Sequence, residues 1–282
     1  MNSAPVGFSL WLHRFAILVA LCMLFLVMTG AAVTGNQLLD NSTPDAHMMR
    51  VFHRHITAHR HGAGGFGLLA VILGVWLMTR PRFRRLGGIL VILTFSEIAI
   101  GTLSLNTPVA AFFHAFLAQL LFASSVAAAV GTKPAWQKEP VFIPDRGWPS
   151  LRGFAVLTCA LVFAQVALGA AYRHELIGVL WHVIGALLLA LFILGTAMLS
   201  MGLPPETASQ GNPLKPPAIL LIVATCLQLT LGLTIVSLAT KALHSPIGMY
   251  LTVIHTTNGS LTLASMVILT LIVQRYMRRE VS

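Results

Sequence analysis

The sequence predicts an all-α integral membrane protein whose eight transmembrane helices form two pseudo-symmetric four-helix bundles. Three observations support this class. The chain has 282 residues, of which 56% are hydrophobic and only 9% are charged, whereas a soluble domain is about 45–50% apolar and about 25% charged. Apolar stretches long enough to cross a bilayer recur along the chain, and the two halves share sequence features. This composition excludes a soluble, disordered or nucleic-acid-binding protein.

The apolar stretches define the helices in order. The first follows His13 and Arg14, but it is too long for the apolar region of a typical signal peptide and lacks a good cleavage site, so we expect it to be a helix. The others each approach the length that crosses the hydrocarbon core. The expected spans are 15–34, 62–79, 87–105, 109–130, 153–171, 176–199, 218–238 and 250–274.

Basic residues predict the orientation. With both termini on the cytoplasmic side, 13 of the 18 lysines and arginines fall on the inner side, as the positive-inside rule requires for an even number of spans. The net charge of +10 therefore mainly records topology. We expect an integral protein of a bacterial cell membrane. The inner residues are Arg14, Arg80, Arg82, Arg84, Arg85, Lys133, Lys138, Arg146, Arg152, Lys215, Arg275, Arg278 and Arg279, and the outer ones are Arg50, Arg54, Arg60, Arg173 and Lys241.

A proline-rich inner segment divides the chain. Residues 131–152 contain four prolines and no apolar run, so we expect a cytoplasmic linker between an N-terminal bundle, 1–130, and a C-terminal bundle, 153–282. Cys22, Cys159 and Cys226 each fall within a span, where cysteine packs as a small hydrophobic residue.

The two halves resemble each other in sequence. The first span ends in Gly-Ala-Ala at 30–32 and the fifth in Gly-Ala-Ala at 169–171. The third span contains Glu-Ile-Ala-Ile-Gly at 97–101, and the seventh contains Gln-Leu-Thr-Leu-Gly at 228–232. Because both halves run in the same direction, the pattern indicates a parallel repeat about an axis along the membrane normal.

Four histidines occupy matching places in this repeat. His59, His114, His182 and His255 lie near the outer ends of the four even-numbered spans. Two histidines at one depth in each half are what the axial ligands of one iron porphyrin require in a four-helix bundle. Small residues follow His59 and His182 and leave room for a flat ring. We therefore expect His59, His114, His182 and His255 to be metal ligands.

Other readings of the polar residues remain open. A lone histidine within a span is commonly a polar contact between helices, and the run from His53 to His61 is compatible with a di-iron or copper site, although no second cluster of this kind occurs. Arg60 and Arg173 either pair with porphyrin propionates or are interfacial residues. Glu97 is either functional or, as its counterpart Gln228 suggests, part of an interhelical hydrogen bond.

Taken in order, these pieces resemble the haem A synthase family. The resemblance covers nearly the whole chain, and no single piece is specific. It rests on the segment 29–35, on His59-Arg60, on His114 to Gln119, on Gln165 to His174, on His182, on Gln228 with Leu231-Gly232, and on His255.

The resemblance implies an oxidoreductase that converts the C8 methyl of haem O to the formyl of haem A. His59 and His114 would bind the haem O substrate and form the catalytic site, and His182 and His255 would hold a haem b cofactor. The implied partners are the enzyme that supplies haem O, the terminal oxidase assembly pathway and membrane lipid, and a homo-oligomer is compatible with the sequence.

Two departures from the family pattern bear on activity. The family commonly carries a glutamate three residues before the histidine of the second span, where this chain has Ile56, and many members have cysteine pairs in outer loops, which this chain lacks. His55 or Glu97 would then replace the carboxylate, or the chain does not make haem A. A b-type cytochrome subunit of a respiratory complex, without catalysis or for electron transfer, is the alternative, and a transporter with buried histidines is a third class.

Overall fold

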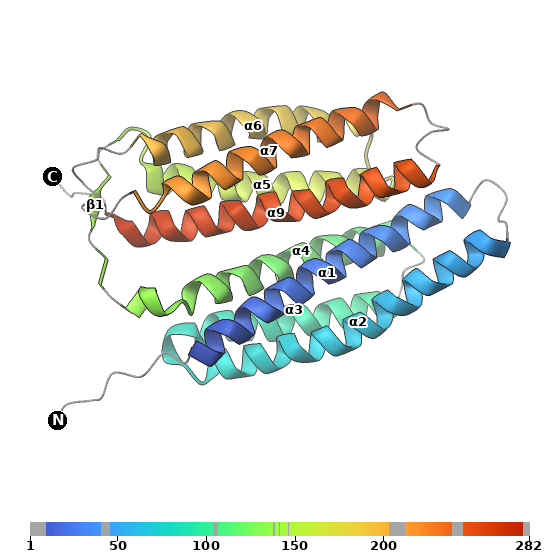
Figure 1. Ribbon diagram of the computed structural model, residues 1–282, viewed down its shortest axis with the longest axis horizontal. Coiled ribbons are helices and arrows are strands. Elements are labelled where there is room, and N and C mark those ends of the chain that lie inside the picture. Colours follow the sequence, from blue (N-terminus) through green and yellow to red (C-terminus); the bar gives the residue numbers. More distant parts are fainter. Residues whose placement is uncertain are drawn as a thin grey trace.

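The computed structural model consists of long helices lying side by side (Figure 1). It describes residues 10–40, 46–103, 107–137, 139–140, 142–145, 147–202, 212–238 and 245–278, with the backbone alone at 35–40, 46–49, 51 and 52. The helices are α1 (Leu10–Asp40), α2 (Ala46–Met78), α3 (Arg84–Leu103), α4 (Pro108–Gly131), α5 (Leu151–Arg173), α6 (Val179–Met201), α7 (Lys215–Ser237) and α9 (Pro246–Tyr276), with short 3-10 turns η1 (Pro81–Phe83) and η2 (Pro134–Gln137).

Eight of these helices are long and apolar enough to cross a membrane, and the expected all-α membrane class is confirmed. The helix ends differ from the expected spans chiefly at α2, which begins at Ala46, so that His59 lies well inside a helix and not at its mouth. Lys138, Arg146, Lys241, His244 and Arg279 lie outside the described residues, as does the side chain of His47.

The helices pack as two rings of four. In the first ring α1 contacts α2 and α4, and α3 contacts both of these; in the second α5 contacts α6 and α9, and α7 contacts both of these. Figure 1 shows α1–α4 on one side and α5–α9 on the other. The helix α9 also packs against α1 and α4, so it forms most of the contact between the two rings.

Helix starts follow from capping residues in the sequence. Thr107 and Ser245 each precede a proline, and their hydroxyls accept hydrogen bonds from Ala110 N and Gly248 N. Proline suits the first helical position because the amide that it lacks would have no helical partner there. These two caps begin α4 and α9 at the end of the molecule where the histidines lie.

The linker between the rings is attached to the C-terminal segment. Its strand β1 (Ile143–Pro144) pairs in parallel with β2 (Met277–Arg278), which follows α9. Asp145, which is 6% exposed, accepts hydrogen bonds from Ser150 Oγ and from the amides of Leu151 and Arg152. The linker thus caps the start of α5 through a buried carboxylate, which satisfies amides that have no helical partner.

Candidate functional site

The four expected histidine ligands form two pairs, one in each ring of helices. The ring centroids of His59 and His114 are 6.3 Å apart with an interplanar angle of 88°. Those of His182 and His255 are 6.4 Å apart with an angle of 78°. All four side chains are half-buried. The structure therefore brings together histidines that are more than fifty residues apart in sequence. The distance between the ring centroids is nearly the same in the two pairs.

Each of these histidines lies against a glycine of the preceding helix. A Cβ built on the glycine would lie within 3.2 Å of Cε1 of the histidine ring. A real Cβ rarely comes that close, so only glycine lets each ring lie so near the neighbouring helix backbone. The four pairs are Gly30 with His59, Gly101 with His114, Gly169 with His182, and Gly232 with His255.

A polar side chain of the same preceding helix contacts each histidine ring. A ligating histidine usually donates its second ring N–H to an acceptor, which fixes the ring and tunes its basicity. The four contacts are Thr29 Oγ1 to His59 Nδ1 at 3.0 Å, Glu97 Oε2 to His114 Nδ1 at 2.5 Å, Gln165 Nε2 to His182 Nδ1 at 3.0 Å, and Gln228 Nε2 to His255 Nε2 at 3.1 Å. Thr29 and Glu97 can accept in this way, whereas both glutamines contact the ring through the donor Nε2.

The spacing of the pairs fits two axial ligands of one iron. A bond from a metal to an imidazole nitrogen is about 2 Å long and that nitrogen lies about 1 Å from the ring centroid, so two axial rings have centroids about 6 Å apart. Both observed separations, 6.3 and 6.4 Å, agree with this value. In the second pair, the Gln228 amide donates to His255 Nε2, and His255 Nδ1 is a buried atom without a hydrogen-bonding partner among the described residues.

The described residues hold no cluster of three or more histidine, cysteine or acidic side chains that could bind a metal ion. A bis-histidine porphyrin site needs only two protein ligands, because the macrocycle supplies the others. Each histidine pair therefore suits a metal held in a porphyrin better than it suits a free metal ion. The expected di-iron or copper alternative gains nothing from the cluster at 53–61.

Arg173 lies between the two pairs. One guanidinium nitrogen donates to Ala31 O at 2.8 Å, next to the glycine that contacts His59, and the other donates to Thr256 Oγ1 at 3.4 Å, next to His255. This side chain therefore joins the C-terminal end of α5 to α1 and α9 and places a positive charge near both pairs. A guanidinium in that position suits a carboxylate ligand such as a propionate.

His174 follows at the C-terminal end of α5 and is half-buried. Burial, together with the charges of Arg173 and His114, lowers the pKa of His174 to about 4. The imidazole is therefore neutral at physiological pH, and Arg173 carries the positive charge at this position.

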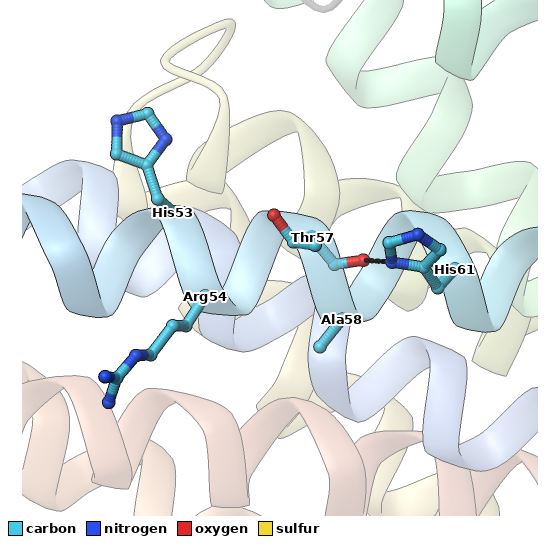
Figure 2. A pocket seen from close by; sticks show the side chains of 5 residues that line it. All are labelled: His53, Arg54, Thr57, Ala58 and His61. Atoms are coloured by element: carbon cyan, nitrogen blue, oxygen red, sulfur yellow. Dashed lines mark hydrogen bonds between the residues drawn. The ribbon is translucent and has the colours of Figure 1, made fainter.

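The other expected arginine lies elsewhere. Arg60 is exposed on α2 although it follows His59, so the structure does not bring it into contact with the histidine pairs. Figure 2 shows a pocket on the same helix lined by His53, Arg54, Thr57, Ala58 and His61, in which His61 Nδ1 donates to the carbonyl oxygen of Thr57. This cluster is a basic surface near one end of α2.

Glu97 and Ile56 differ in what they contact. Glu97 is 9% exposed and lies against His114, so the interhelical pairing suggested by Gln228 occurs in both halves. Ile56 is half-buried on α2 and supplies no polar atom. The three cysteines are free thiols within helices.

Sequence reasoning missed the packing glycines and the role of Thr29. A signal was present in the spacing, because Glu97, Gln165 and Gln228 each precede a glycine by four residues and thus share its helix face. The first helix has Leu26 at that place, and Thr29 provides the polar contact there. A comparison of the chain with protein-family models and with curated proteins finds no match.

Proposed function

We propose that the chain is a haem A synthase-like membrane oxidoreductase with one porphyrin site in each ring of helices. The observation that carries the proposal is the pair of histidine separations, 6.3 and 6.4 Å, each with supporting polar contacts. His59 and His114 would hold haem O as substrate, and His182 and His255 would hold haem b. The product would be haem A for terminal oxidase assembly, in a bacterial cell membrane with both termini cytoplasmic.

The chain's own residues would bind and orient the porphyrins. A porphyrin iron held by these histidines would supply the redox chemistry that no side chain provides, because oxidation of an unactivated methyl needs an oxidising centre. Thr29 and Glu97 would fix the ring planes of the N-terminal pair, and Gln165 and Gln228 those of the C-terminal pair. Arg173 would attract propionate carboxylates to the region between the pairs.

A second candidate is a b-type cytochrome that transfers electrons without modifying its haem. Ile56 favours this candidate, because this half-buried residue, three positions before His59 on α2, offers no proton acceptor. The equal separations do not distinguish haem O from haem b, because iron–nitrogen bonds would set them in both.

Extraction and chromatography of the bound porphyrins test both candidates. The full chain is purified from cells with and without the enzyme that supplies haem O. Haem A formed only when haem O is supplied supports the synthase, haem b alone supports the cytochrome, and purified protein without any haem overturns both.

Single-histidine variants assign the two sites. We expect His182→Ala and His255→Ala to lose the low-spin haem b spectrum, and His114→Ala to keep that spectrum but to form no haem A. His61→Ala is the matched control, because this exposed residue lies on α2 outside both pairs. An unchanged haem b spectrum in His182→Ala and His255→Ala would refute the assignment of the cofactor site.

A further inference from the structure

The two histidine pairs differ in the chemistry of their supporting side chains. On α3, α5 and α7 the residue four positions before the packing glycine contacts the histidine of the next helix. That residue is a carboxylic acid on α3, Glu97, and an amide on α5 and α7, Gln165 and Gln228. The same structural position therefore carries a potential negative charge in the N-terminal ring of helices and a neutral group in the C-terminal ring.

The Glu97 carboxylate is committed to His114. It is 9% exposed, and Oε2 lies 2.5 Å from Nδ1 of His114. Apart from this ion-pair contact, neither carboxylate oxygen has a hydrogen-bonding partner among the described residues. Among the described residues, the carboxylate therefore interacts with the imidazole of His114 alone.

The amides at the equivalent positions are shared with other groups. Gln165 Nε2 also donates to the backbone carbonyl oxygen of His182 at 2.8 Å. Gln228 Oε1 accepts from Asn258 Nδ2 at 2.8 Å. Both amides reach the imidazole through Nε2, which can only donate, whereas an ionised carboxylate can only accept. The glutamines therefore add no electron density to the imidazole, and Glu97 does.

We infer that Glu97 makes the N-terminal pair the more electron-donating one, so that a porphyrin iron held by His59 and His114 has a lower reduction potential than the same porphyrin held by His182 and His255. A carboxylate beside the ring nitrogen that does not bind the metal raises the basicity of a ligating imidazole. Hydrogen bonding around the ligands is one of the factors that set haem potentials. This inference rests on the proposed function. It gives the two sites different roles: the N-terminal site favours oxidised iron, and the C-terminal site favours reduced iron.

Titration of one porphyrin in both sites tests the inference. The full chain is reconstituted with excess iron protoporphyrin IX, so that the protein alone sets any difference in potential, and is titrated spectroelectrochemically. We expect two components. Glu97→Gln should raise the lower potential and leave the higher one unchanged. Glu97→Asp keeps the carboxylate and should therefore retain much of the difference between the two potentials.

The matched variant Gln228→Glu places a carboxylate in the other ring of helices and should lower the higher potential alone. A lost fold cannot imitate these opposite shifts, since each changes one component of a protein that still holds two haems. A single component, or two components that Glu97→Gln does not move, overturns the inference while the two-site proposal stands if haem is bound by both pairs. Failure to bind any haem overturns both.

Discussion

The glycine beneath His182 offers a test of how closely the ring must approach the neighbouring helix. A Cβ at position 169 would lie 3.0 Å from His182 Cε1 and 3.4 Å from Nδ1, whereas ordinary contact begins at 3.4 Å. In Gly169→Ala the ring must therefore retreat by about 0.4 Å from the new methyl. A metal–ligand distance tolerates only about 0.2 Å, so the displacement should weaken an axial bond and lower haem affinity by about tenfold.

Haem retention measures this effect. Wild type, Gly169→Ala and the control Gly88→Ala are titrated with haem in detergent, and the low-spin absorbance is followed. A Cβ at position 88 meets nothing within 4 Å, so the control should bind as the wild type does, and alanine should even favour the helix by about 0.5–1 kcal/mol. Equal affinity and equal low-spin spectra for all three proteins would refute the requirement for close packing.

Two further predictions concern stability. Asp145→Ala removes the buried acceptor for the amide of Leu151 and should lower the free energy of unfolding by about 2 kcal/mol; thermal unfolding in detergent measures this, with Asp145→Asn as the control that keeps one acceptor oxygen. The unfolded chain binds a proton at His174 more readily than the folded protein does, because folding lowers the pKa from 6.5 to about 4. Stability should therefore fall as the pH drops from 6.5 to 4, and His174→Gln should flatten that part of the pH profile; an unchanged profile would show that His174 is not the group responsible.

The sequence predicts the helices well because their signal is strong. Apolar stretches of this length have few alternatives in a membrane, where backbone groups must be satisfied within a helix. The expected and observed helices differ at α2, which starts at Ala46. The polar run before Gly62 is not apolar enough to be recognised as part of a span, yet it continues the same helix.

The site was predictable in its histidines but not in their surroundings. His59, His114, His182 and His255 stand out because histidine is rare and costly within spans. Their packing glycines and Thr29 do not stand out, since glycine and threonine are common in membrane helices for other reasons. The structure is also needed to show that Arg60 is exposed on α2, whereas Arg173 contacts α1 and α9.

The place of α9 between the two rings of helices has a consequence for biosynthesis. Chains are made from the N-terminus, so α1–α4 enter the membrane long before α9. The side-chain amide of Gln119 on α4 donates to Ser260 Oγ on α9 at 2.9 Å, across a separation of 141 residues. The buried amide on α4 therefore gains this partner only after the last helix has been synthesised, so the packing of the first ring of helices is completed only when the second half of the chain is present.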